Sequence, residues 1–179
     1  MGWKTLSDAF GIEKHIVCVT SNGICIGSGY VHDLATIDPA TGILHESKTF
    51  NGFVAKHYPE LGKATPDELL ALIQADDTFT DSITVYTYQD GNIIEKLCEK
   101  PGWPNATHDG ELMYENSFST DRAKVIRWAK RDAELRVTHT ERYLNQTKEQ
   151  LATIERDLES ARAAVAKLEA DYPGVPHTD

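Results

Sequence analysis

HIVCVTSNGICIGSGYV, residues 15–31, decides how the first part of this chain folds. Two runs rich in Ile, Val and Cys lie on either side of Ser21, Asn22 and Gly23. Such runs favour β-strands, and Asn followed by Gly is a strong hairpin signal because both residues accept a positive φ at little cost. The stretch therefore predicts an antiparallel hairpin.

Further turn signals extend this prediction along the chain. They recur at Asp38–Gly42, between VHDLATI and ILHES, and at Asp90–Gly91, between ITVYTY and NIIEKL. ELMYENSF, residues 111–118, has the pattern of one more strand. We therefore expect residues 1–118 to form a domain with an antiparallel sheet of about five to seven strands.

One short helix is expected to cover a face of that sheet. In ATPDELLALIQADD, Thr65 is placed to cap the helix, Pro66 suits its first residue, and Glu68 completes a capping box. The opening WKTLSDAFG, residues 3–11, suits either a short helix or an arm.

Residues 119–172 have the pattern of a long helix. No Gly or Pro occurs between Gly110 and Pro173, and a heptad repeat runs without a skip from Ala123. A helix of about 50 residues extends roughly 75 Å, far beyond the roughly 30 Å width of the first domain. Its distal apolar seam then needs a partner, so we expect a coiled coil that makes the protein a homo-oligomer. The seam residues are Leu144, Leu151, Ile154, Leu158, Val165 and Leu168.

The alternative is a helical hairpin, broken near the polar stretch RVTHTERYLNQT, residues 136–147. Residues 173–179 are expected to be a flexible tail. The fold class expected from all of these patterns is α+β.

The charge of the chain is unevenly distributed. Residues 1–118 hold 7 Lys, no Arg and 17 Asp and Glu, a formal charge of −10, whereas residues 119–179 are neutral. Nucleic-acid affinity rests on cationic contacts, so no direct nucleic-acid binding is expected. The N-terminus lacks a signal-peptide pattern, no apolar run is long enough for a membrane, and the three Cys include no CxxC pair. These features suggest a cytoplasmic protein with reduced thiols.

The segment GWPNATHDG, residues 102–110, is the main candidate site. One interpretation is an ordinary connection between strands, in which Asn, Thr and Asp side chains bond their own backbone. The other is a binding loop on a rigid sheet, with aromatic rings for stacking and polar groups for directional hydrogen bonds. The candidate residues are Trp103, Asn105, Thr107, His108 and Asp109, together with Tyr114, Tyr30, Arg122 and Arg127.

Catalytic and metal motifs are weak. Gly27–Tyr30 has no following helix and lacks the third Gly of a dinucleotide loop. The pairs His32-Asp33 and His108-Asp109 could serve a metal-dependent hydrolase, but no other His spacing supports a metal site. No cofactor and no metal are therefore expected.

KPGWPNATHDGELMYENSFSTDRAKVIRWAKRDAE, residues 100–134, resembles small bacteriophage accessory proteins of unknown role. The resemblance implies a protein made in an infected bacterial cell, and it carries over no functional residue.

Three functions are therefore considered. The first is a non-catalytic, oligomeric binding protein that inhibits a host protein, such as a defence protein, through its acidic sheet domain. The second is sequestration of a small molecule, such as a nucleotide-type signal. The third is a metal-dependent hydrolase that uses His32, Asp33, His108 and Asp109.

Overall fold

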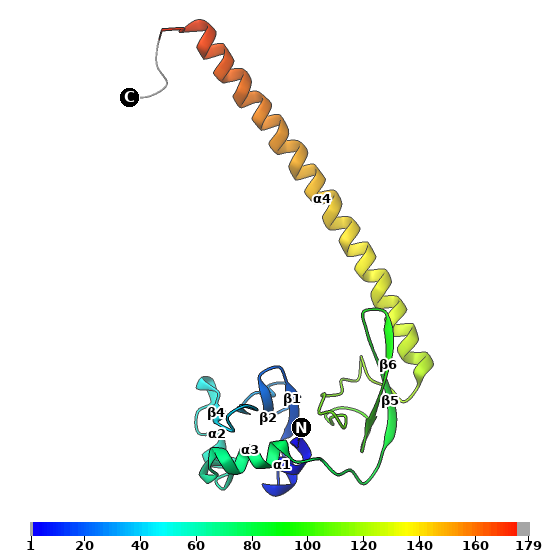
Figure 1. Ribbon diagram of the computed structural model, residues 1–179. Coiled ribbons are helices and arrows are strands. Elements are labelled where there is room, and N and C mark those ends of the chain that lie inside the picture. The colour runs from blue at the N-terminus through cyan, green and yellow to red at the C-terminus, as the bar shows by residue number, and fades with distance from the viewer. Residues whose placement is uncertain (1, 175–179) are drawn as a thin grey trace. The chain divides into compact units, whose positions relative to one another are not determined.

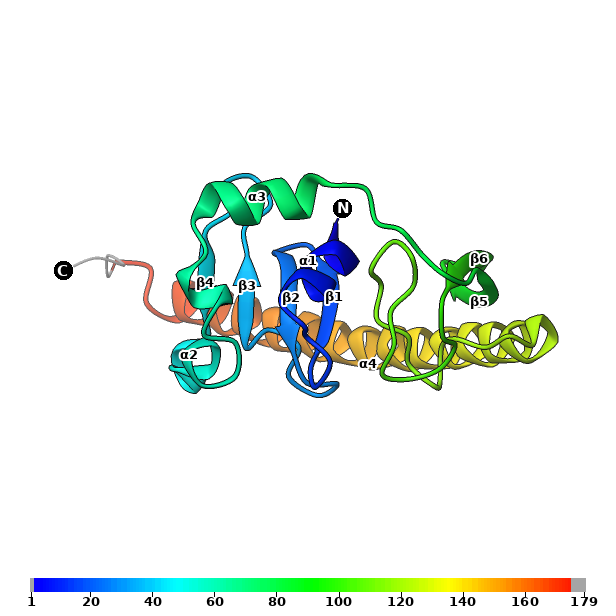
Figure 2. The same cartoon turned by 90° about the horizontal axis from the view of Figure 1, so that it is seen from below.

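Residues 16–46 form a four-stranded antiparallel sheet in the computed structural model, which describes residues 2–174 (Figure 1). β1 (Ile16–Thr20) pairs with β2 (Gly23–Gly27), and Thr20 lies opposite Gly23. β3 (Ala35–Ile37) and β4 (Leu44–Glu46) follow in the order β1-β2-β3-β4, as Figure 2 shows. The hairpin predicted around Asn22 is confirmed, with Ser21 and Asn22 as its turn.

The turn between β3 and β4 also forms as expected. The carboxylate of Asp38 accepts hydrogen bonds from the backbone N–H groups of Ala40 (2.8 Å) and Thr41 (2.9 Å). Gly42 takes a φ of +69°, which a residue without a Cβ adopts readily.

Apolar side chains of the sheet are buried on both of its faces. Successive side chains of a strand point to opposite faces, and all five residues of β2 are buried. Ile24 and Ile26 join the larger core, whereas Cys25 on the opposite face packs with Cys18 and Leu112. The second face is therefore covered by the connection that carries the candidate site.

Short helices cover the larger core. They are α1 (Trp3–Ala9), α2 (Phe53–His57) and α3 (Pro66–Gln74), with 3-10 turns at Lys48–Phe50 and Leu61–Lys63. The predicted capping box is confirmed, since the Thr65 hydroxyl accepts from the Glu68 N–H (3.3 Å) and the Glu68 carboxylate from the Thr65 N–H (2.8 Å). Leu69 and Ile73 on α3 are buried beside Leu6 of α1.

A second, two-stranded sheet consists of β5 (Ile83–Gln89) and β6 (Asn92–Cys98). Asp90 and Gly91 form its turn with φ of 49° and 80°, the pair of positive values that a type I′ turn requires. One face of this hairpin packs Val85 and Cys98 against Met113 and Phe118.

α4 (Arg122–Asp171) is one continuous helix of 50 residues. The Asp121 carboxylate caps it by accepting from the N–H groups of Ala123 (2.9 Å) and Lys124 (3.1 Å). The helix has no break at residues 136–147, so the helical-hairpin alternative is wrong. The chain divides into two compact units, residues 1–130 and 131–179, and the second begins within this helix.

The α+β class is confirmed, but three details of the sequence prediction differ from the structure. The strands form two sheets rather than one. The opening residues form the helix α1 rather than an arm, and α2 is a helix that the sequence prediction did not include. Residues 111–118 form one isolated bridge, at Leu112, and a turn instead of a strand. Leu112, Met113 and Phe118 are buried in tertiary clusters. The backbone N–H groups of Ser117 and Phe118 donate to the Tyr114 carbonyl, which makes this part of the segment a turn. The predicted tail begins at Pro173, and its residues 175–179 lie outside the described residues.

Candidate functional site

The candidate loop lies in the connection between β6 and α4, where the chain returns on itself. The backbone N–H of Met113 donates to the Asn105 carbonyl (2.9 Å), and that of Thr107 donates to the Glu111 carbonyl (2.9 Å). Gly110, at the tip, has a φ of +84°. Asn105 uses both its backbone N–H and its side-chain amide to bond the Gly102 carbonyl at 3.0 Å. These hydrogen bonds lie within the loop itself, as expected for an ordinary connection between strands.

Thr107 and Asp109 also serve the loop itself. The buried Thr107 hydroxyl accepts from the Glu111 N–H (3.0 Å) and donates to the Asp109 carboxylate. Asp109 forms an ion pair with Lys96 of β6 (2.6 Å), and Lys96 also contacts the Glu111 carboxylate. Partial burial disfavours the charged form of Lys96 and so acts to lower its pKa. The carboxylates of Asp109 and Glu111 outweigh this effect, and the pKa of Lys96 is raised. Burial acts to raise the pKa of Asp109, but the hydrogen bonds from Lys96 and Thr107 outweigh it and lower that pKa.

His108 connects three segments of the first unit. Its ring stacks on Phe79 with centroids 3.7 Å apart and planes 6° apart, and its Nε2 lies 3.1 Å from the Asp81 carbonyl oxygen. Its backbone N–H donates to the Leu97 carbonyl (2.7 Å), and its carbonyl accepts from the Trp3 indole (3.0 Å). The His108 ring therefore makes structural contacts with Phe79 and the Asp81 carbonyl.

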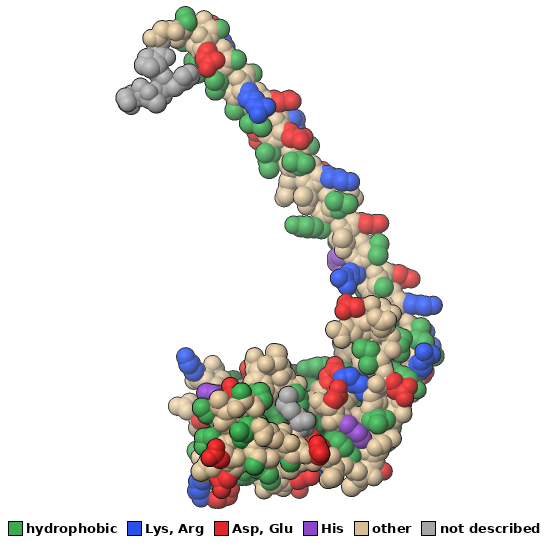
Figure 3. All heavy atoms as spheres, in the orientation of Figure 1, with side chains coloured by type: hydrophobic (Ala, Val, Ile, Leu, Met, Phe, Trp, Pro, Cys, Tyr) green, Lys and Arg blue, Asp and Glu red, His purple; other side chains and the backbone are tan. Residues whose placement is uncertain are grey.

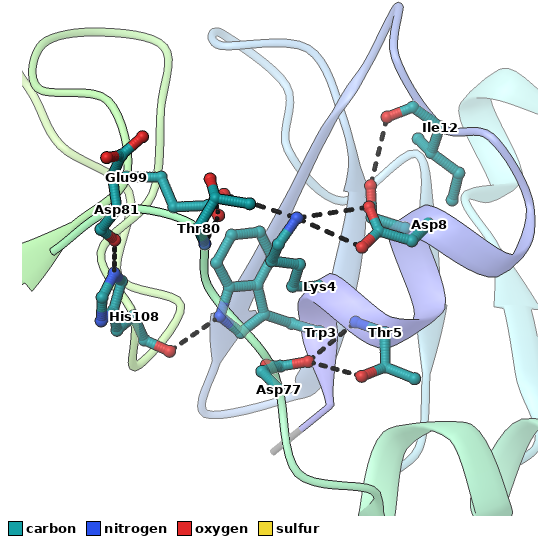
Figure 4. Close-up of polar contacts among 11 residues, drawn as sticks. Trp3, Lys4, Thr5, Asp8, Ile12, Asp77, Thr80, Asp81, Glu99 and His108 are labelled. Atoms are coloured by element: carbon teal, nitrogen blue, oxygen red, sulfur yellow. Dashed lines mark hydrogen bonds and ion pairs between the residues drawn. The ribbon is translucent and has the colours of Figure 1, made fainter.

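Figure 4 shows the polar contacts that join His108, α1 and the segment between α3 and β5. The Asp77 carboxylate accepts from the N–H (2.7 Å) and hydroxyl (2.9 Å) of Thr5 in α1. Glu99 accepts from the Thr80 N–H (2.7 Å) and pairs with Lys4 at 3.4 Å. The segment between α3 and β5 is therefore tied to α1 on one side and to the end of β6 on the other.

Trp103 and Tyr30 are the two candidate residues that the fold brings together from distant segments. Their ring centroids lie 5.5 Å apart at 60°, and Tyr30 is 88% exposed. A Cβ at Gly29 would overlap the Trp103 ring, so the glycine allows the indole to lie against this loop. The exposed Tyr30 ring beside the half-buried Trp103 ring can stack on a planar ligand.

The remaining candidates lie elsewhere. Tyr114 lines a cavity of about 280 Å³ together with Cys18, His32 and Thr87. Arg122 is the exposed first residue of α4. Arg127 pairs with Asp121 at 3.8 Å within the same helix start. This ion pair is not directed to the loop.

Two further cavities were not predicted from the sequence. One of about 340 Å³ is lined by residues that include Trp3, Lys14, His15, Lys100 and Asn105. Another, of about 380 Å³, lies beside α2 and is lined by residues that include Lys14, Lys56 and His57. They combine residues from distant segments, so no local motif could reveal them.

His15 belongs to an aromatic cluster between these cavities. Its Nδ1 lies 2.7 Å from the Tyr58 hydroxyl, and its ring contacts Phe53 and His57. Burial, with the nearby charges of His57 and Lys14, lowers the pKa of His15.

The thiols of Cys18 and Cys98 are poor nucleophiles. Burial, with Cys25 and Asp33 nearby, raises the pKa of Cys18 to about 11, and burial also raises the pKa of Cys98. Both are therefore protonated at neutral pH. Within residues 2–174, no three His, Cys, Asp or Glu side chains gather in a way that could hold a metal ion.

No helix among the described residues is both long and apolar enough to span a membrane. Comparison with protein-family models, with curated proteins and with solved structures gave no match.

Proposed function

We propose that this chain is a non-catalytic binding protein that self-associates through α4 and engages a partner protein through the acidic surface of residues 1–118. The observation that carries the proposal is the apolar seam of α4. Every described residue from Ala133 to Gly174 is exposed in the single chain, and large apolar side chains recur among them (Figure 3). The α4 seam consists of Val137, Leu144, Leu151, Ile154, Leu158, Val165 and Leu168.

A second copy of the same helix fits this seam. Its side chains are 48–63% exposed. In the heptad frame that takes Ala123 as position a, Val137, Leu144, Leu151, Leu158 and Val165 are at a, and Ile154 and Leu168 are at d. Apolar surface of this extent is uncommon on monomers, and a heptad seam buries it against an equivalent helix. Self-association would also present several copies of the acidic unit and so increase avidity.

Light scattering coupled to size exclusion tests this part of the proposal. The wild-type chain should elute as an oligomer, and the double variant Leu151→Glu/Leu158→Glu should be monomeric with its helix content reduced. Ala152→Glu is the matched control, because residue 152 lies outside the seam and Ala is replaced by another good helix former. A monomeric wild-type chain at high micromolar concentration would contradict self-association.

The acidic surface supports a partner with a basic face. Among residues 2–174, several exposed carboxylates make neither a hydrogen bond nor an ion pair: Glu13, Asp33, Asp67, Asp76, Asp81, Glu95 and Glu115. Uncompensated charge of one sign attracts an oppositely charged surface and accelerates association. The resemblance to phage accessory proteins favours a host protein as this partner.

Capture from bacterial lysate, followed by binding of the purified partner, tests this surface. Replacing Asp76, Asp81, Glu95 and Glu115 with Lys should abolish capture, and binding of the wild-type chain should weaken as salt rises. The variant must stay oligomeric and folded. Undiminished binding by that variant would remove the acidic surface from the proposal.

The Trp103–Tyr30 pair favours sequestration of a planar small molecule as a second candidate. It predicts that a ligand leaves the freshly purified wild-type protein in a fixed ratio on denaturation, as measured by mass spectrometry. Trp103→Ala should purify without that ligand, and Trp128→Ala should keep it. Retention of the ligand by Trp103→Ala would place it elsewhere.

A further inference from the structure

We infer that two α4 helices associate antiparallel, in the register that places Leu151 opposite the partner's Ile154. The inference rests on the proposed self-association and adds its direction and register. In an antiparallel coil, each a residue faces a d residue of the second helix, so one register defines every layer of the core.

The sizes of the core residues favour this arrangement. Small or polar residues at d then meet larger apolar residues at a: Thr140 faces the partner's Val165, Thr147 the partner's Leu158, and Ala161 the partner's Leu144. Val137 faces the partner's Leu168. Each of these layers therefore contains at least one Val, Leu or Ile.

A parallel, in-register coil would place each residue opposite its own copy. Thr140, Thr147 and Ala161 would then form three layers that contain no large apolar side chain. Layers of small residues leave voids, and paired hydroxyls displace apolar contact, so this direction has the weaker core.

The flanking charges select the register. In the proposed coil, Glu141 faces the partner's Arg162, and Lys148 faces the partner's Glu155. At the ends, the like charges of Glu134 and the partner's Glu169 are offset by Arg136 and the partner's Asp171.

Neighbouring antiparallel registers bring like charges together. A shift of one heptad in one direction places Glu155 opposite the partner's Glu155, and a shift in the other direction places Lys148 opposite the partner's Lys148. Like charges at these positions disfavour a pairing, as opposite charges favour one.

The charge of the first part of the chain favours the same direction. Residues 1–118 carry a formal charge of −10 and precede α4 in each chain. In the proposed coil, the two copies of residue 131 are about 65 Å apart at a rise of 1.5 Å per residue, many times the screening length of about 8 Å. A parallel coil would bring two such charges to the same end.

A charge swap on one chain tests the direction, because the two arrangements predict opposite results. In the antiparallel coil, Glu141→Arg and Arg162→Glu should each weaken dimerisation roughly tenfold, and the double variant should recover to within about threefold of wild type. In a parallel coil, the pairs are Arg136 with the partner's Glu141 and Asp157 with the partner's Arg162. The double variant would then place like charges at both, and it would bind roughly a hundredfold more weakly than wild type.

Dissociation constants from sedimentation equilibrium at low salt provide the readout. Glu149→Arg is the matched control, since residue 149 lies on the outer side of the heptad frame, and it should dimerise like wild type. Recovery in Glu141→Arg/Arg162→Glu supports the antiparallel coil. A double variant weaker than both single variants overturns the direction but leaves self-association standing. A wild-type chain that stays monomeric overturns self-association itself.

Discussion

The indole Nε1 of Trp3 donates a 3.0 Å hydrogen bond to the backbone carbonyl of His108, 105 residues further along the chain. Trp3 belongs to α1, whereas His108 belongs to the connection after β6 and stacks on Phe79. The bond therefore ties the N-terminal helix to the candidate loop. It makes the loop part of the first unit's tertiary structure rather than a free surface segment.

Trp3→Phe should lower the free energy of unfolding of the first unit by about 1 kcal/mol, because the aromatic packing stays while the hydrogen bond is lost. Urea unfolding followed by circular dichroism measures the change. Trp128→Phe is the control. The Trp128 ring lies on α4 with its centroid 4.9 Å from the Lys124 Nζ, so this substitution should lower the free energy of unfolding by less. An unchanged midpoint for Trp3→Phe would show that water replaces the bond at no cost.

Lys96→Met should change the acid dependence of stability. The folded pKa of Asp109 is lowered, so its contribution is full above the unfolded value of about 3.9 and is lost as the pH falls through the folded pKa. The variant lacks the cation that favours the Asp109 carboxylate. It should be less stable than wild type at pH 7 and lose less stability below pH about 4.

Urea midpoints between pH 3 and 7 measure this difference. Lys100→Met serves as the comparison, because it removes an exposed lysine from the same part of the chain. Parallel pH curves for Lys96→Met and wild type would show that the ion pair with Asp109 contributes nothing.

Thr65→Ala should destabilise the first unit by about 1 kcal/mol, because it removes the hydroxyl that accepts from the Glu68 N–H and donates to the Glu68 carboxylate in the α3 capping box. Thr65→Ser keeps a hydroxyl at the same position and should stay close to wild type. Thermal unfolding compares the three proteins. Equal losses in the Ala and Ser variants would assign the effect to the methyl group instead of the cap.

Cys18 should resist thiol reagents in the folded protein. Its pKa of about 11 leaves little thiolate at pH 8, and its side chain is 2% exposed. Maleimide labelling, read by peptide mass, should modify Cys18 only after denaturant is added. Rapid labelling of Cys18 under native conditions would contradict its placement under Leu112.

The candidate site illustrates what sequence reasoning could reach. Composition singled out residues 102–110, and the fold brings Trp103 of this segment into contact with Tyr30, while a binding role of the loop stays a prediction. Thr107 bonds within its own loop, as expected for a connection between strands, whereas the roles of His108 and Asp109 could not be assigned from local sequence. Their partners Lys96, Phe79 and the Trp3 indole come from other segments, and no local pattern encodes such pairings.

The sequence by itself determined the local structure of this protein. Gly42, the Asp90-Gly91 pair and the Thr65–Glu68 box act through the backbone of their immediate neighbours, so their turns and cap form as expected. The heptad pattern likewise indicated one long helix, because helical periodicity is a local property.

Only the tertiary structure decided which strands share a sheet and what residues 111–118 become. Leu112 completes the apolar face behind Cys18 and Cys25, whereas Met113 and Phe118 pack on the β5–β6 hairpin. The apolar character of these residues indicates that they will be buried, but not against which face. That choice depends on the free energy of packing between segments far apart in the chain. The second sheet and the surroundings of the candidate loop result from this packing, so local sequence could not predict them.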